Sequence, residues 1–353
     1  MSENYDLAVI GSGPGGYVCA IRAAQLGLNV ICIDKRGAHG GTCLNVGCIP
    51  SKALLHASEV YHETKSSSSM GINVDNVSIN LQEMMNYKEE GINGNVKGID
   101  FLFKKNKVES IYGIAKILSS NQINIKLNDG SEKLIEAKNI VIATGSKPIV
   151  PSFITFDKKR VITSTEALSL KECPKNLSII GAGVIGLELG SVFARLGAKV
   201  KVFDYSYSII SFMDRSIGNE LKKVLTNHLG FEFNMSNKVE SVKTIGKKVE
   251  IISEDENGNK ITEKSDYCLV SVGRKPYTDG LGLENLSIEV DERGRIKVNE
   301  KLQTSVSNIF AIGDVISGPM LAHKAEEDGV FVAETIAGQI PHIDYNLVPS
   351  VIY

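Results

Sequence analysis

The feature that most constrains the fold is a pattern that occurs twice in the chain. Each copy runs from a short apolar stretch through a Gly-X-Gly-X-X-Gly loop into a helix-forming stretch, and then to a second apolar stretch that ends in an aspartate. The loop starts at Gly11 in the first copy and at Gly181 in the second, and Asp34 and Asp204 each follow 23 residues later. This spacing predicts two β–α–β units with a dinucleotide-binding loop at the start of each helix.

The chemistry of such a loop explains its glycines. Without side chains the backbone can approach a pyrophosphate, and the helix N-terminus offers free N–H groups and a partial positive charge. The aspartate at the end of the second strand can accept hydrogen bonds from a ribose diol. A single glycine loop is weak evidence, but both copies have this context. Two sites predict two dinucleotides and, most simply, electron transfer between them.

Composition limits the partners. The 353 residues, 42% of them hydrophobic, are enough for two domains with a core each. Basic residues number 39 and acidic residues 41 without a basic cluster, so we expect no nucleic-acid partner. No apolar stretch approaches the roughly 20 residues of a membrane span, and "MSENYDLAVI" lacks the features of an export signal. We expect no membrane partner and a cytoplasmic protein, or a matrix protein if a eukaryotic source has removed a transit peptide.

The stretch "GGTCLNVGCIPSK" places Cys43 and Cys48 five positions apart. A metal site needs about four ligands, and no second pair completes one, so no metal is expected. A structural bridge is disfavoured in a reducing compartment. Pro50 suits the first position of the helix predicted next, and a helix start lowers a thiol pKa. A redox-active pair is favoured, and a structural staple is the alternative.

The same pair constrains the local backbone. Five residues of regular helix rise about 7.5 Å, beyond the roughly 6.8 Å limit for bridged Cα atoms. The segment must therefore depart from a regular helix, and Gly47 permits this. Further along, residues 53–105 predict helices interrupted by a polar loop at "TKSSSSMG", and residues 108–142 predict short strands around an "NDG" turn. A last helix is predicted over "LAHKAEEDGVFVAETIAG".

Three stretches, "GGTCLNVGCIPSK", "GAGVIGLELGSVFARLGAKV" and "TSVSNIFAIGDV", resemble the pyridine nucleotide–disulfide oxidoreductases, in particular the members that oxidise dihydrolipoyl groups of 2-oxoacid dehydrogenase complexes. The resemblance covers essentially the whole chain. It implies an α/β fold of two Rossmann-like, glutathione-reductase-type domains. An FAD-binding domain (1–149 and 274–345) would contain an inserted NAD-binding domain (150–273), and 346–353 would start a dimerisation domain.

The resemblance also implies an FAD site around the first glycine loop. Asp34 would bind the adenosine ribose, although the family more often has Glu there; Asp314 would bind the ribitol hydroxyls; and Lys52 would lie near the flavin N5 edge. Residues 320–323 would close over the flavin. The full implied set is Gly11, Gly13, Gly15, Gly16, Asp34, Lys35, Gly41, Thr42, Cys43, Lys52, Gly113, Ala143, Thr144, Gly145, Asp314, Met320, Leu321, Ala322 and His323.

The second loop would bind the nicotinamide nucleotide. Asp204 would bind the ribose diol and repel a 2′-phosphate, and the following "YSYS" has no arginine, so NAD is favoured over NADP. Glu188 would pair with Lys52. The implied set is Gly181, Ala182, Gly183, Val184, Ile185, Gly186, Leu187, Glu188, Asp204, Val239 and Gly273.

The implied reaction uses Cys43, Cys48, Lys52 and Glu188 as catalytic residues. A dihydrolipoyl dithiol would attack the disulfide at Cys43, the thiolate pair would reduce FAD with Cys48 against the flavin, and a hydride would pass to NAD. The partner would be the dihydrolipoyl domain of a 2-oxoacid dehydrogenase complex, and the full-length form would be a homodimer.

Family members continue into an interface domain that supplies a His–Glu base, whereas this sequence stops at "LVPSVIY" within an apolar strand pattern. We expect an incomplete sequence or a fragment. Two alternatives stay open: an NADPH-dependent disulfide or mercuric reductase, and a nucleotide-binding fragment without turnover. Plainer interpretations also exist, with Lys52 and Glu188 as solvated surface charges and His323 as an exposed helix residue.

Overall fold

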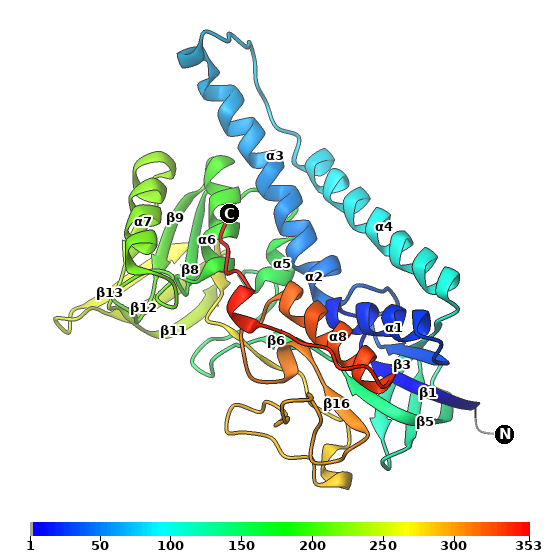
Figure 1. Cartoon of the computed structure of the whole chain (residues 1–353). Helices are drawn as coiled ribbons and strands as arrows, with labels where there is room; N and C mark the ends of the chain where they lie inside the picture. The colour runs from blue at the N-terminus through cyan, green and yellow to red at the C-terminus, as the bar shows by residue number, and fades with distance from the viewer. Residues whose placement is uncertain (1–2) are drawn as a thin grey trace. The chain divides into compact units, whose positions relative to one another are not determined.

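The computed structural model describes residues 3–353, which form two compact units. Unit 1 contains the residues up to Asn45 together with Ile92–Lys147 and Arg274–Ser350. Unit 2 contains Val46–Gly91, Pro148–Gly273 and Val351–Tyr353. Figure 1 labels many of the helices and strands of both units along the chain.

Unit 1 is built on a parallel sheet whose strand order is β3–β2–β1–β5–β16. Strand β4 pairs antiparallel with β3 and with the first half of β5, through the predicted turn at 128–130. The bounds are β1 Glu3–Ile10, β2 Val30–Asp34, β3 Glu109–Ile117, β4 Gln122–Leu127, β5 Glu132–Ile142 and β16 Ile309–Ala311. Strand β2 is buried throughout, as expected of a strand covered on both faces.

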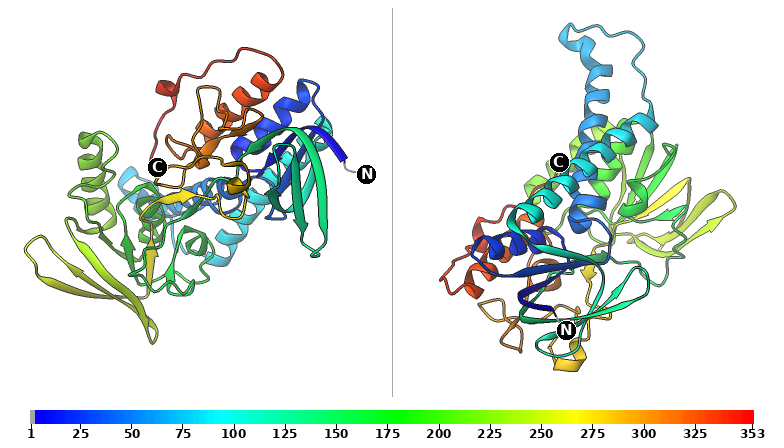
Figure 2. Two further views of the ribbon diagram at one scale, coloured as in Figure 1. Left: turned by 90° about the horizontal axis from the view of Figure 1, so that it is seen from below. Right: turned by 90° about the vertical axis from the view of Figure 1, so that its right-hand side faces the viewer.

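Helices α1 (Pro14–Gln25) and α8 (Ala322–Ile336) pack tightly on each other in unit 1. They lie side by side in Figure 1 and in both views of Figure 2, where α1 is blue and α8 orange to red. A Cβ on Gly15 would lie 2.7 Å from the Ala325 carbonyl oxygen, and one on Gly329 would lie 2.5 Å from the Gly15 oxygen. Only glycine at both positions allows the two helix backbones to approach this closely. The contact therefore fixes the start of α1, which follows the first glycine loop, against α8.

Unit 2 repeats the pattern with a parallel sheet of order β10–β9–β8–β14–β7. The strands are β7 Val161–Ile162, β8 Asn176–Ile180, β9 Lys199–Phe203, β10 Glu232–Asn234 and β14 Tyr267–Val270, and the helices are α5 Ser164–Ala167, α6 Val184–Arg195 and α7 Arg215–Leu229. An antiparallel sheet of β11 (Lys238–Ile245), β12 (Lys248–Glu254) and β13 (Lys260–Ser265) forms the yellow-green hairpins of Figure 2. Each unit contains a glycine-loop β–α–β, which confirms the predicted fold class.

The segment after the cysteines forms α2 (Gly41–Val46), α3 (Cys48–Ser66), the short 3₁₀ helix η1 (Ser67–Met70) and α4 (Leu81–Asn106). Two expectations are wrong in detail. Helix α3 begins at Cys48, so Pro50 is its third residue rather than its first. The serine run of the predicted loop ends α3 and forms η1, and the irregular segment lies at 71–80 instead.

Residues Val46–Gly91 cluster with unit 2, although the expected FAD-binding domain runs over 1–149. The cause is apolar packing: Leu54, Leu55 and Met84 are buried in one cluster with Leu187 and Phe193 of α6.

The remaining short elements are β6 (Ser146–Pro148), which pairs with β15 (Arg274–Pro276), and the 3₁₀ turns η2 (Leu283–Leu286), η3 (Gly313–Val315) and η4 (Tyr345–Leu347). The apolar pattern at 348–353 predicts a strand, but none of the described residues pairs with it and no strand forms. Within residues 3–353 no helix is long and apolar enough to cross a membrane.

Candidate redox and nucleotide-binding site

The three glycines of the first loop have different surroundings. Gly11 has a φ of +105°, and a Cβ there would lie 2.4 Å from the Ala143 oxygen; a Cβ on Gly16 would lie 1.8 Å from the Gly11 oxygen. Both glycines are therefore required by the protein's own backbone. Around Gly13, by contrast, the nearest atom to a Cβ would be the Gly41 Cα at 3.9 Å. This space opens at the N-terminus of α1, where a pyrophosphate is favoured.

The second loop divides its glycines in the same way. Gly181 also has a φ of +105°, and its Cβ would lie 2.5 Å from the Ser271 oxygen; a Cβ on Gly186 would lie 2.6 Å from the Gly181 oxygen. A Cβ on Gly183, at the start of α6, would meet no described atom within 4 Å beyond its chain neighbours. Both loops therefore have room for a phosphate at their second glycine, and the residues present fit a dinucleotide.

The two acids hold the glycine loops. Oδ2 of Asp34 accepts hydrogen bonds from the Ser12 N–H at 2.7 Å and the Ser12 hydroxyl at 2.6 Å. Oδ2 of Asp204 accepts the Ala182 N–H at 2.6 Å. Sequence reasoning assigned both acids to a ribose and missed this second task and Ser12. The signal was available, since the same acid-to-loop spacing occurs in both copies.

A polar group surrounds Asp314 in unit 1. The Ser146 hydroxyl donates to Asp314 Oδ2 at 2.5 Å, and Arg274 donates through Nε to the Ser146 hydroxyl and through Nη2 to its carbonyl oxygen, both at 2.7 Å. Burial lowers the pKa of the Arg274 guanidinium, and the charge of Asp314 opposes that shift. Ser146 and Arg274 were not among the predicted site residues. The mirrored sequences "ATGSKP" and "SVGRKP" place them at corresponding positions and were the available signal.

Other predicted FAD residues of unit 1 have structural contacts of their own. Lys35 has its ammonium 3.4 Å from the centre of the Tyr277 ring. A Cβ on Gly113 would lie 2.7 Å from the Lys126 oxygen, so strand packing already requires that glycine. A Cβ on Gly41 would lie 2.5 Å from the Gly13 Cα, so the start of α2 lies against the glycine loop. The ring nitrogen Nε2 of His323, at the start of α8, lies 2.9 Å from the Pro349 oxygen.

Cys43 and Cys48 are joined in a disulfide. Cys43 lies in α2, and Cys48 is the first residue of α3. Between the helices Gly47 has φ −145° and ψ −113°, far from helical values. The expected break in the helix at Gly47 is confirmed.

Lys52 and Glu188 form the predicted pair in unit 2. The Lys52 ammonium lies 3.0 and 2.8 Å from the two carboxylate oxygens of Glu188. The Glu188 side chain is only 4% exposed, so its interpretation as a solvated surface charge is wrong. The backbone N–H of Tyr353 donates to the same carboxylate at 3.2 Å, and its ring centre lies 4.6 Å from the Lys52 ammonium. A buried carboxylate thus holds a partly exposed cation.

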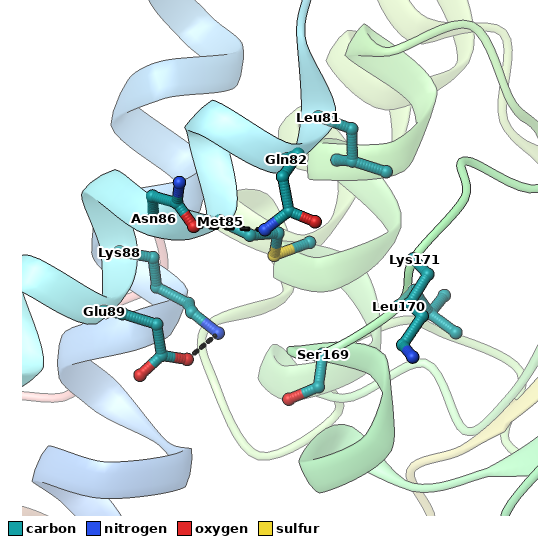
Figure 3. Close-up of a pocket in the computed structure, with 9 residues that line it drawn as sticks. All are labelled: Leu81, Gln82, Met85, Asn86, Lys88, Glu89, Ser169, Leu170 and Lys171. Atoms are coloured by element: carbon teal, nitrogen blue, oxygen red, sulfur yellow. Dashed lines mark hydrogen bonds and ion pairs between the residues drawn. The ribbon is translucent and has the colours of Figure 1, made fainter.

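The remaining predicted residues and cavities lie elsewhere. Val239 borders an irregularity in the pairing of β11 with β12, and Gly273 has a φ of +113° and accepts the Ile149 N–H at 3.0 Å. Unit 2 contains a cavity of about 190 Å³. Figure 3 shows the residues that line it, and none of them is a predicted site residue. Among the described residues no group of three or more His, Cys, Asp and Glu is arranged to bind a metal. The cavity of Figure 3 is lined by Leu81, Gln82, Met85, Asn86, Lys88, Glu89, Ser169, Leu170 and Lys171.

Comparison with known proteins gives a consistent result. The family model described as "Pyridine nucleotide-disulphide oxidoreductase" matches residues 5–329. A mitochondrial dihydrolipoyl dehydrogenase of Pisum sativum is 48% identical over 100% of this chain and 70% of its own length. The mitochondrial dihydrolipoyl dehydrogenase of Rattus norvegicus is 48% identical over 99% of this chain and 69% of its own length. A leghemoglobin reductase of Vigna unguiculata is 48% identical over 100% of the chain and 68% of its own length.

Proposed function

The chain belongs to the pyridine nucleotide-disulphide oxidoreductases, and we propose that it oxidises dihydrolipoyl groups with NAD through the Cys43–Cys48 disulfide and FAD. The observation that carries the proposal is a disulfide across a helix break, with Lys52 on the helix that begins at Cys48 paired to the buried carboxylate of Glu188 on α6. A structural staple does not need this charged neighbour.

The cofactor sites follow the two units. We assign FAD to the first glycine loop, with Asp34 on the ribose and Asp314 on the ribitol, and NAD to the second loop with Asp204. This keeps the proposed FAD-binding domain as 1–149 and 274–345 and the NAD-binding domain as 150–273. Bound FAD supplies a two-electron carrier between the cysteine thiols and NAD. The open space at Gly13 and Gly183 supports both assignments.

The cysteines perform a dithiol–disulfide exchange. A thiolate of the substrate attacks the sulfur of Cys43, the Cys43–Cys48 bond breaks, and Cys48 leaves as a thiolate. The second substrate thiol then attacks the mixed disulfide, so the substrate gains an S–S bond while Cys43 and Cys48 gain two electrons. A base removes the two substrate protons, and no residue of this chain is assigned that task.

The position of Cys48 favours its role as leaving group. Cys48 is the first residue of α3, where the helix N-terminus stabilises a negative charge. Lys52 follows four positions later, on the same face of the helix. Glu188 restrains the Lys52 ammonium and leaves it partly exposed. We therefore assign Lys52 to stabilising the thiolate and Glu188 to positioning Lys52.

The partners are proposed on the same basis. The relatives named dihydrolipoyl dehydrogenase support a role with 2-oxoacid dehydrogenase complexes, and we propose their dihydrolipoyl domain as the electron donor. Homodimer formation by the full-length form is also proposed. The mitochondrial relatives support the matrix location, and the cytoplasmic location remains the alternative.

Anaerobic titration with NADH tests the proposal. Flavin alone accepts one two-electron equivalent, so the protein should take up more than one, and Cys48→Ser should lose the excess while keeping its flavin absorbance. Equal uptake by both proteins with flavin bound would return the staple interpretation. A preference for NADPH would favour the reductase alternative, and flavin reduction without turnover of dihydrolipoamide would favour the nucleotide-binding fragment.

A further inference from the structure

His39 is a buried histidine with no part in the proposed chemistry of Cys43 and Cys48. Its side chain is 4% exposed, and it directly precedes Gly40, the first residue of the segment that carries both cysteines. An imidazole is a costly residue to bury without a partner. Its contacts are therefore informative.

The His39 ring is anchored on two elements of unit 1. Its Nδ1 lies 2.6 Å from Oδ1 of Asp100 on α4, whose side chain is 50% exposed. The ring centre lies 4.6 Å from that of Phe103 on α4 and 5.3 Å from that of Tyr112 on β3. The Tyr112 hydroxyl is 3.4 Å from the same Nδ1. The imidazole is thus held by one carboxylate between two aromatic rings.

The backbone of His39 closes the turn that bears Cys43. The Asn45 side-chain amide donates to the carbonyl oxygens of His39 and Gly41, each at 2.9 Å. The Gly40 N–H donates to the Ser12 oxygen of the glycine loop at 2.8 Å. The side chain of His39 therefore fixes one end of this turn on α4 and β3, while Gly40 fixes it on the first glycine loop.

We propose that His39 is a positioning residue for the redox disulfide. Its bond to Asp100 restrains the turn that bears Cys43, and this restraint favours the disulfide over the dithiol. The inference rests on the proposed redox function of Cys43 and Cys48. Bridging these cysteines requires a non-helical backbone around Gly47, so a restrained turn before Cys43 raises the effective concentration of the two thiols. A loosened turn lowers that concentration and favours the dithiol.

The groups facing the imidazole are Asp100 from α4 and the Tyr112 hydroxyl from β3, with Asp34 of β2 opposite Tyr112 in the sheet. Burial raises the pKa of Tyr112, and the charges of Asp100 and Asp34 raise it further, so the phenol stays neutral. The imidazole therefore faces one carboxylate and one neutral phenol, and the carboxylate of Asp100 is its ionised partner.

The test uses His39→Phe, which keeps a stacked ring without Nδ1, Asp100→Asn, and the double variant. Glu90→Gln, an exposed acid on the same helix, is the charge-matched control. The flavin-containing proteins are equilibrated with oxidised and reduced dithiothreitol at one fixed pH. Acid quenching, alkylation and mass spectrometry then give the fraction of Cys43–Cys48 dithiol. We expect each single variant to shift the equilibrium about tenfold towards the dithiol, roughly 30 mV for two electrons.

Because His39 and Asp100 act through one shared bond, their single variants should not have additive effects. The double variant should shift the equilibrium no more than the larger single variant, and Glu90→Gln should stay within about twofold of wild type. A shift under twofold in Asp100→Asn, or single shifts that add up in the double variant, would overturn the inference. If His39→Phe does not fold, Asp100→Asn at a half-exposed site decides alone. A wild-type disulfide that dithiothreitol cannot reduce overturns the proposed function itself.

Discussion

Alanine at Gly13 should separate flavin binding from folding. Gly13 has φ −68° and ψ −178°, which any residue adopts, and a Cβ there would meet no described atom closer than 3.9 Å. Alanine allows the unfolded chain fewer conformations than glycine does, which raises the free energy of unfolding of Gly13→Ala by about 0.4–1 kcal/mol. Alanine is also a poorer N-cap residue than glycine, and this lowers the free energy of unfolding by a similar amount. The stability of the flavin-free protein should therefore change by less than about 1 kcal/mol.

The flavin affinity should fall much more. The added methyl group occupies the space from which a pyrophosphate would accept hydrogen bonds from the N–H groups of α1. Two charge-assisted hydrogen bonds at about 1.5–3 kcal/mol each amount to about 3–6 kcal/mol. This corresponds to a loss of roughly 10² to 10⁴ in affinity for FAD.

The assay compares three alanine variants of matched chemistry. FAD binding to deflavinated protein is measured by fluorescence titration, and stability by urea unfolding. Gly11→Ala should unfold more readily, because its φ is +105° and its Cβ would overlap the Ala143 oxygen. Gly183→Ala should keep FAD and weaken NADH binding. A Gly13→Ala protein with wild-type FAD affinity would refute the assignment, and so would one destabilised as much as Gly11→Ala.

Three further predictions use other parts of the structure. In steady-state kinetics kcat/KM should be higher with NADH than with NADPH. Asp204→Asn should bring the two values closer together, because it removes the repulsion of a 2′-phosphate. Equal kcat/KM values for the two nucleotides in wild type would contradict this prediction. Asp328 is fully buried, lies 2.7 Å from the Lys324 ammonium and accepts hydrogen bonds from the Gly313 N–H and the Tyr345 hydroxyl, so Asp328→Asn should cost about 3–5 kcal/mol in urea unfolding. Adding Lys324→Met should restore part of that loss, and a larger loss in the double variant would argue against a buried ion pair. Burial acts to raise the pKa of Asp157, but hydrogen bonds from the Thr244 hydroxyl and from backbone N–H groups lower it on balance, so its stabilisation is present above the unfolded pKa and is lost as the pH falls below about 4. Acid unfolding of Asp157→Asn should therefore show a weaker pH dependence than that of wild type, and identical profiles would exclude this contribution.

The sequence alone determined those features that depend on neighbouring residues. The sequence predicted a glycine loop at the start of each of two helices, and the structure has these loops at Gly11 and Gly181, each with the same positive φ. The spacing of Cys43 and Cys48 required a break in the helix, which Gly47 provides. These conclusions hold because backbone sterics and helix rise act over a few residues and need no knowledge of the fold.

Tertiary structure decided which distant residues meet. Ser146 bonds Asp314 across 168 positions, and Arg274 bonds Ser146 across 128 positions. The interval from Lys52 to Glu188 is 136 positions, and only the resemblance suggested that pair. His39 bonds Asp100 across 61 positions, and no local pattern marks either residue. Such contacts follow from how strands and helices pack, because the free energy of burying a charged group depends on the partner that the fold brings to it.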